Sequence, residues 1–307
     1  NLLVLSGGFL SFFLKSNLLK IILHVSRMLK SIQNMMTREI NIGGVRINDA
    51  SDCFVIAEIG HNHQGKVSNA MAMIESAKEC GVNAVKLQKR DNKSLFTRAL
   101  YNQNYDNENS FGATYGAHRE SLELGEEDYV ALKQYCEHLG ILFFATPFDF
   151  ASADFLEKLN LPLYKIASGD LTNIPLIEHV AKFKKPLLIS TGGGTMIDVR
   201  RAYDSVKAIW GQFAFLQCTA AYPPAFEELN LRVIESYRQE FPDIVIGYSG
   251  HDSGIAMAPA AYVLGARIIE KHFTLNRAMK GTDHAFSLEP VGMRKMVRDL
   301  RRTKVAL

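Results

Sequence analysis

The feature that most constrains this chain is a two-part unit that repeats eight times between Cys53 and about Lys304. Each unit is a short apolar run followed by a segment in which apolar residues recur at helical spacing. The apolar runs cover residues 53–59, 84–88, 141–147, 162–168, 186–191, 213–219, 244–249 and 267–274. Such runs predict strands buried on both faces, as in parallel sheets covered by helices.

The segments after these runs predict helices at residues 67–80, 126–139, 151–159, 174–183, 196–210, 231–241, 255–264 and from 290 onward. A long polar stretch, residues 91–125, separates the second run from its helix. Eight such units over about 250 residues are typical of a (β/α)8 TIM barrel. The alternative is a doubly wound sheet, which usually has a G-x-G-x-x-G turn after its first strand. Residues 60–65 are GHNHQG instead, so we predict an α/β chain with a TIM barrel at 53–307.

Two segments precede the predicted barrel. Residues 39–48 alternate around Gly43-Gly44 and predict a short β-hairpin within 36–52. Residues 1–38 contain no Asp or Glu, and their longest uncharged run, residues 1–14, is shorter than the ~18 apolar residues of a membrane span. We interpret residues 1–35 as a leader outside the fold. It is a translation product upstream of a start at Met35 or Met36, a transit-like peptide or a membrane-surface helix.

Charge and cysteine usage limit the partners. The chain has 35 Lys and Arg against 32 Asp and Glu, a net charge of +3 that does not indicate a nucleic-acid partner. The four cysteines lie far apart and form no CxxC pair, which indicates reduced thiols. We therefore expect a cytoplasmic protein with small-molecule ligands and no membrane span.

The active site of a TIM barrel forms at the carboxyl ends of its strands. Lys86 and Lys165 occupy equivalent positions in the second and fourth predicted strands. Burying an ammonium group without an anion is costly, so these lysines predict a phosphorylated or carboxylated ligand. Ser168, Ser190 and the amides of residues 192–194 are suited to cradle a phosphate.

Two histidines end the seventh and eighth predicted strands, which are neighbours in a barrel. His251 and His272 are therefore able to share one divalent metal ion, and the alternative is a hydrogen-bonded core pair. Glu270 precedes His272 by two residues, so both side chains point to the same face of the strand. Glu270 is a candidate acid or base, and Glu58 on the first strand is another carboxylate.

The strand ends also carry motifs that resemble the sialic acid synthase (N-acylneuraminate synthase) family. The motifs are IAEIGHNHQG from Ile56, YKIASGD from Tyr164, LQCTAAYP from Leu216, IGYSGH from Ile246, EKHFT from Glu270 and KGTDHAFSLEP from Lys280. The resemblance extends from about residue 39 to the end of the chain. It implies condensation of phosphoenolpyruvate with N-acetylmannosamine, or its 6-phosphate, to give the nine-carbon sugar acid and phosphate.

The resemblance implies roles for individual residues. The phosphoenolpyruvate contacts match Lys86, Lys165, Ser168, Ser190, Tyr222 and Ser249. The amino-sugar contacts match Gln88 and Asp283, and the carboxylates near the reacting carbons match Glu58, Asp170 and Glu270. The metal ligands match His251 and His272, for Mn²⁺ in the first place and Mg²⁺ or Co²⁺ as alternatives. Some relatives carry Glu at the position of Asp170, and some bacterial members carry Asn at that of Ala220.

Family members usually have a further antifreeze-like domain at the C-terminus, which in a homodimer supplies an arginine to the partner's sugar site. This sequence stops at Leu307 in or just after the eighth predicted helix, so we expect that domain to be absent from it. Three other functions stay open. They are synthesis of a related nonulosonic acid of the legionaminic or pseudaminic type, a Schiff-base pyruvate aldolase that uses Lys165, and a non-catalytic barrel that binds sugar phosphates.

Overall fold

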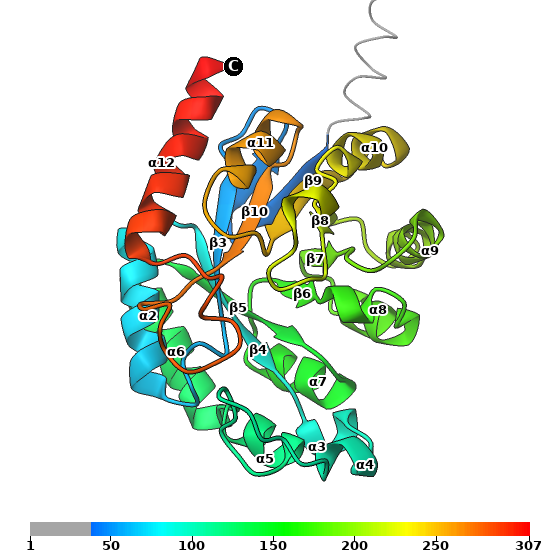
Figure 1. Cartoon of the computed structure of the whole chain (residues 1–307). Helices are drawn as coiled ribbons and strands as arrows, with labels where there is room; N and C mark the ends of the chain where they lie inside the picture. The colour runs from blue at the N-terminus through cyan, green and yellow to red at the C-terminus, as the bar shows by residue number, and fades with distance from the viewer. Residues whose placement is uncertain (1–37) are drawn as a thin grey trace, which may run out of the picture. The chain divides into compact units, whose positions relative to one another are not determined.

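The computed structural model describes residues 38–307, and the predicted leader, residues 1–35, lies outside the described residues. Eight parallel strands close into a barrel in the order β10-β3-β4-β5-β6-β7-β8-β9, with helices on its outside (Figure 1). The strands are β3 (Phe54–Gly60), β4 (Ala84–Lys89), β5 (Leu142–Pro147), β6 (Tyr164–Ile166), β7 (Leu187–Ser190), β8 (Phe213–Cys218), β9 (Val245–Gly250) and β10 (Ile268–His272). The predicted TIM barrel is confirmed.

The outer helices follow the predicted segments closely. They are α2 (Val67–Glu79), α6 (Glu126–Leu139), α7 (Phe150–Lys158), α8 (Ile174–Ala181), α9 (Met196–Lys207), α10 (Val233–Glu240), α11 (Met257–Val263) and α12 (Pro290–Ala306). Local chemistry fixes several ends. The Thr195 hydroxyl accepts from the Asp198 amide at the start of α9, and Gly140 ends α6 with φ of 64°.

The fourth strand is shorter than predicted. Residues 162–168 were expected to be extended, but only Tyr164–Ile166 pair in the sheet. A 3-10 turn, η1 (Ser168–Asp170), follows two residues after this strand. A second 3-10 turn, η2 (Phe226–Glu228), lies between β8 and α10.

The polar stretch between β4 and α6 contains three short helices that periodicity did not predict. They are α3 (Asn92–Leu95), α4 (Arg98–Tyr101) and α5 (Tyr115–Glu120). Thr97 and Thr114 cap the last two by accepting the amides of Leu100 and Ala117. Helices of four to six residues are too short to show an amphipathic period, so they escape prediction.

A β-hairpin precedes the barrel, as predicted. β1 (Glu39–Ile42) pairs antiparallel with β2 (Val45–Asn48). Ile40, Ile42 and Ile47 are fully buried among apolar side chains that point into the barrel from the amino ends of its strands. The hairpin therefore covers the amino end of the barrel, and residues 39–307 form one compact unit.

The inside of the barrel has an apolar layer below and a polar layer above. Strand alternation assigns the inward positions, for example Ile56 and Glu58 on β3. The lower layer contains Phe54, Ile56, Ala84, Phe144, Leu163, Leu188, Ala214, Leu216, Val245 and Ile268. The upper layer contains Glu58, Lys86, Thr146, Lys165, Ser190, Cys218, Ser249 and Glu270. Within residues 38–307 no helix has both the length and the apolar character needed to cross a bilayer.

The packing of the hairpin yields a stability prediction. Ile42→Ala removes a fully buried side chain beneath the barrel, and we expect it to lower the free energy of unfolding by about 2–5 kcal/mol. The matched control is Val45→Ala on the same hairpin, where the side chain is 41% exposed and the expected change is within about 0.5 kcal/mol. Urea unfolding followed by circular dichroism measures both. Equal stability of the two variants would show that the hairpin does not support the barrel.

Candidate active site

A cavity of about 290 Å³ opens at the carboxyl ends of the strands, and every strand of the barrel contributes to its lining. All predicted site residues except Asp170 line it: Glu58, Lys86, Gln88, Lys165, Ser168, Ser190, Tyr222, Ser249, His251, Glu270, His272 and Asp283. The barrel therefore brings together residues that are up to 225 positions apart, from Glu58 to Asp283.

Two lysines and two glutamates form a buried charge cluster at the bottom of the cavity. Lys86 Nζ lies 2.9 Å from Glu58 Oε2 and 3.8 Å from Glu270 Oε2, and it donates to Thr146 Oγ1 at 2.8 Å. Lys165 Nζ donates to Ser190 Oγ at 2.6 Å and lies 3.6 Å from Glu270 Oε1. The sequence predicted that these lysines need an anion, and the chain itself supplies two carboxylates.

The two glutamates of this cluster differ in proton affinity. Burial raises the pKa of Glu58 to about 7, and the nearby Glu270 charge adds to the effect, although Lys86 and Gln88 oppose it. Burial also acts to raise the pKa of Glu270, but Lys165 and Lys86 outweigh it and hold that pKa below its ordinary value. Paired carboxyl groups with separated pKa values are typical of sites in which the two groups have different roles.

The histidine pair lies on the other side of Glu270. The rings of His251 and His272 are 5.4 Å apart between centroids, and the ring of Tyr222 lies 4.1 Å from that of His251. His251 Nδ1 donates to the Thr219 carbonyl at 2.9 Å, which leaves Nε2 with a lone pair. His272 Nδ1 is buried, has no hydrogen-bond partner among residues 38–307 and lies 3.7 Å from Asp283 Oδ2.

These two imidazoles fit a divalent cation. Burial lowers the pKa of His251 to about 3 and of His272 to about 4, so both rings are neutral near pH 7 and hold free lone pairs. Among residues 38–307 no group of three His, Cys, Asp or Glu side chains is gathered as a metal cage. A cation here would need further ligands from substrate or water, as at catalytic metal sites.

Gly60 ends β3 next to three polar side chains that line the cavity. Its φ is 54°, in the left-handed region that favours glycine. A Cβ atom there would lie 3.2 Å from Gln88 Nε2, 3.3 Å from Glu58 Oε1 and 3.6 Å from Asp283 Oδ2. Glycine therefore lets these three polar side chains approach one another.

Asp170 does not line the cavity. It lies half-buried in η1, where Asn173 Nδ2 donates to its Oδ1 at 3.2 Å. It lies within electrostatic reach of Arg90, which does line the cavity. Its catalytic role stays a prediction. Ser168 from the same turn does line the cavity, and its Oγ accepts the Gly192 amide at 3.0 Å.

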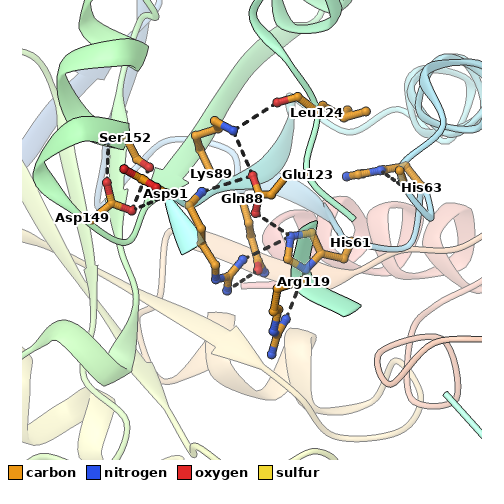
Figure 2. Close-up of polar contacts among 12 residues, drawn as sticks. His61, His63, Gln88, Lys89, Asp91, Arg119, Glu123, Leu124, Asp149 and Ser152 are labelled. Atoms are coloured by element: carbon orange, nitrogen blue, oxygen red, sulfur yellow. Dashed lines mark hydrogen bonds and ion pairs between the residues drawn. The ribbon is translucent and has the colours of Figure 1, made fainter. Parts of the chain in front are cut away.

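Sequence reasoning missed two arginines that line the cavity, Arg90 and Arg119. Arg90 continues the inward alternation of Lys86 and Gln88 by one further step beyond β4, so strand period was a usable signal. Arg119 lies on α5, and tertiary packing, not a local sequence pattern, brings this helix to the cavity. Figure 2 shows it beside His61, with Gln88, Lys89 and Glu123 in the same polar network.

Comparison with known proteins places this site in a family. Residues 73–307 match the NeuB family. The chain is 45% identical over 255 residues to N-acetylneuraminate-9-phosphate synthase of Homo sapiens, covering 83% of this chain and 71% of that protein. It is 37% identical over 273 residues to N,N′-diacetyllegionaminic acid synthase of Legionella pneumophila, covering 87% and 76% of the two chains.

A solved structure agrees with these sequence relatives. The N-acetylneuraminic acid (sialic acid) synthetase of Leptospira borgpetersenii, in complex with citrate, superposes with a TM-score of 0.79 at 31% identity, over 88% of this chain and 90% of that one. The chain therefore belongs to the NeuB family. Within it the protein is an enzyme of the N-acylneuraminate synthase type, and the family resemblance noted in the sequence is confirmed.

The unequal glutamates yield a spectroscopic prediction. We expect a carboxyl signal that titrates near pH 7 in pH-difference infrared spectra and disappears in Glu58→Gln. Gln88 Nε2 donates to Glu58 Oε1 at 2.7 Å and stabilises the ionised carboxylate. Gln88→Met therefore raises the midpoint above that of the unsubstituted protein. A signal that survives in Glu58→Gln, or a midpoint unchanged in Gln88→Met, would contradict this assignment.

Proposed function

We propose that the enzyme condenses phosphoenolpyruvate with N-acetylmannosamine, or its 6-phosphate, to form N-acetylneuraminate, or its 9-phosphate, and inorganic phosphate. The observation that carries this proposal is the union, in one cavity, of the buried lysine–glutamate cluster with the neutral histidine pair. The relatives named N-acetylneuraminate-9-phosphate synthase support the same reaction.

The lysine cluster is the part of the cavity suited to phosphoenolpyruvate. Lys86 and Lys165 supply positive charge, and Ser190 and Ser249 supply hydroxyl groups beside it. Ser249 Oγ donates to Glu270 Oε1 at 3.1 Å, so this hydroxyl reaches the same charge cluster. Ser168 and Tyr222 add polar groups at the wall and rim. Ammonium and hydroxyl groups gathered in this way suit a ligand with a carboxylate and a phosphate.

The sugar lies next to this cluster in the proposal. Gln88 and Asp283 orient its hydroxyl groups, because both line the cavity beside Glu58. His251 and His272 would hold a divalent cation, Mn²⁺ in the first place, with Mg²⁺ and Co²⁺ as alternatives. When bound, such a cation supplies Lewis-acid polarisation of a carbonyl oxygen.

Two carboxylates of the chain, Glu58 and Glu270, assist the formation and cleavage of bonds in this proposal. The enol carbon of phosphoenolpyruvate attacks the aldehyde carbon of the open-chain sugar, and a carbon–carbon bond forms. Positive charge develops at the carbon that bears the phosphate, where ionised Glu58 stabilises it. Glu270, an anion among two lysines, accepts a proton from the water that adds to this carbon. Phosphate then leaves with cleavage of its bond to this carbon, and the remaining proton of the added water departs with it as the keto group forms. The proton taken up by Glu270 passes to the former aldehyde oxygen, which becomes a hydroxyl group.

The sugar class and the setting of the enzyme belong to the same proposal. The relatives named N,N′-diacetyllegionaminic acid synthase favour a diacetamido sugar as the second candidate substrate. A product assay with N-acetylmannosamine, its 6-phosphate and a diacetamido analogue separates them. The four free cysteines support a reducing compartment, the cytoplasm, and the resemblance supports a homodimer for the full-length protein.

Dependence on both substrates and a cation tests the reaction. We expect phosphate release from phosphoenolpyruvate only when an N-acylmannosamine and Mn²⁺ are both present. EDTA abolishes the release and added Mn²⁺ restores it, because neutral His251 and His272 need a cation to complete the site. Activity that persists in EDTA, with a covalent adduct at Lys165 trapped by borohydride, would favour the Schiff-base aldolase. No release with any sugar would favour a binding barrel.

The position of bond cleavage is tested with isotopic water. In ¹⁸O-labelled water we expect the label in the sugar acid and not in the released phosphate, because water adds to carbon. Mass spectrometry of both products measures this. Label in the phosphate would show P–O cleavage and contradict the roles given to Glu58 and Glu270.

A further inference from the structure

The mouth of the cavity contains two arginines that flank one histidine. Arg90 Nη1 lies 3.2 Å from His61 Nε2, and Arg119 Nη1 lies 3.5 Å from His61 Nδ1. All three side chains line the cavity that holds the buried lysine–glutamate cluster. Figure 2 shows His61 between Glu123 and Arg119. None of these three residues has a part in the reaction steps above.

The two guanidinium groups have no carboxylate in direct contact among the described residues. In the part of the chain from residue 38 to 307, no carboxylate lies within 4.0 Å of Arg90 or Arg119 in an ion pair. Glu123 pairs with Lys89 at 3.0 Å and accepts the Arg90 backbone amide at 3.3 Å, and its Oε1 lies 3.6 Å from His61 Nε2. Glu123 and Asp283 act on the charge of Arg90, and Asp283 acts on that of Arg119, only from beyond ion-pair distance.

One of the two guanidinium groups also has no acceptor on the His61 ring. Burial lowers the pKa of His61 well below its ordinary value, and the charge of Arg90 adds to this, so the ring is neutral and has one lone pair. That lone pair accepts from Arg90 or from Arg119, but not from both. Whichever tautomer is present, one guanidinium N–H points at an N–H of the ring and lacks an acceptor there. An anionic oxygen from a ligand would supply one.

The surroundings hold these groups in place. Arg90 Nη2 donates to Gln88 Oε1 at 2.8 Å, and its guanidinium lies 3.6 Å from the centre of the Phe148 ring. Arg119 Nε and Nη2 donate to Tyr115 Oη at 3.0 and 2.8 Å. Burial, followed by the charge of Arg119, lowers the pKa of Arg90 to about 10, so it stays charged near pH 7. The cationic centre is preorganised before any ligand binds.

We propose that Arg90 and Arg119, with His61 between them, form an anion subsite for the phosphate monoester of a phosphorylated amino sugar. The inference rests on the proposed function and deepens it, because it selects the phosphorylated sugar over the free one. Gln88 joins the two parts of the cavity: its Nε2 donates to Glu58, and its Oε1 accepts from Arg90. A sugar held at Gln88 and Asp283 therefore has the arginines on the side away from Lys86.

A phosphate suits this subsite better than a neutral hydroxyl group. Guanidinium groups bind phosphate oxygens with two parallel N–H donors, and these charge-assisted bonds are about twice as strong as neutral ones. A free sugar would leave both arginine charges unmatched in a partly buried site, which is unfavourable. The same unmatched charges are neutralised when a dianionic phosphate enters.

Arg119→Gln tests the subsite because Arg119 contacts His61 and Tyr115 and not Gln88. With saturating phosphoenolpyruvate and Mn²⁺, we expect kcat/KM for N-acetylmannosamine 6-phosphate to fall about 10- to 100-fold. The value for free N-acetylmannosamine and the KM of phosphoenolpyruvate change less than about threefold, since neither ligand reaches Arg119. Arg119→Lys keeps the charge without the planar fork and gives an intermediate loss.

The control is Arg98→Gln, which removes the same charge from an exposed position on α4 outside the cavity. It leaves kcat/KM for both sugars unchanged, and thermal melting checks that each variant is folded. An equal fall for both sugars in Arg119→Gln, no fall for either, or a rise confined to the KM of phosphoenolpyruvate would overturn the proposal.

A binding measurement separates this proposal from the proposed reaction. Calorimetric titration with EDTA present compares N-acetylmannosamine 6-phosphate with the free sugar. We expect the phosphorylated sugar to bind at least 10-fold more tightly, and Arg119→Gln to abolish the difference. Equal affinities in the unsubstituted protein would overturn the subsite. Tight binding without phosphate release under any condition would uphold the subsite and contradict the condensation.

Discussion

Four buried charges inside the barrel constrain the rest of the structure. Glu270 lies within 4 Å of both lysines, and Glu58 completes the balance through Lys86. Removing one partner of such a buried pair typically costs about 3–5 kcal/mol, because the remaining charge has no compensation. The four side chains therefore require β3, β4, β6 and β10 to meet at one height in the barrel. The closed sheet satisfies this, since Glu58 pairs in register with Lys86 and with His272.

The apolar layer beneath this cluster strengthens the Coulomb attraction within its ion pairs. Along each strand, successive inward-facing side chains change from apolar to polar, as from Ile56 to Glu58 on β3 and from Ile268 to Glu270 on β10. Alternation sends both members of each pair into the barrel. The lower members pack against the hairpin isoleucines and exclude water from below, so the polar members reach solvent only through the cavity. Low local polarity strengthens the Coulomb attraction between the pairs and raises the pKa of Glu58.

The sequence was sufficient wherever one strand or helix period decided the outcome. Strand period placed Lys86, Lys165 and Glu270 inside the barrel, and the topology rule placed them at one end. Strand period was not sufficient where a short turn, or the packing of a segment distant in sequence, determined the position of a side chain. In the turn η1, Ser168 lines the cavity and Asp170 does not. The return of α5 brought Arg119 to the cavity across 29 residues from Arg90, and no local pattern encodes that approach.

The proposed reaction brings two anionic substrates into one cavity, and this explains how charge is arranged along it. In the proposed reaction the new carbon–carbon bond connects the enol carbon of one substrate to the aldehyde carbon of the other. A phosphate at C6 of the sugar would then lie at the far end from the phosphate of phosphoenolpyruvate. Two dianions in one small cavity repel each other strongly unless each is neutralised locally. The structure has two separate cationic centres, Lys86–Lys165 and Arg90–Arg119, with Glu58 and Gln88 between them. The lysines already have carboxylate partners of the chain, whereas within residues 38–307 no carboxylate lies in ion-pair contact with the arginines. The Arg90–Arg119 centre, which has no carboxylate in contact, can therefore attract the sugar phosphate. The charge balance around Lys86 and Lys165 is then left undisturbed.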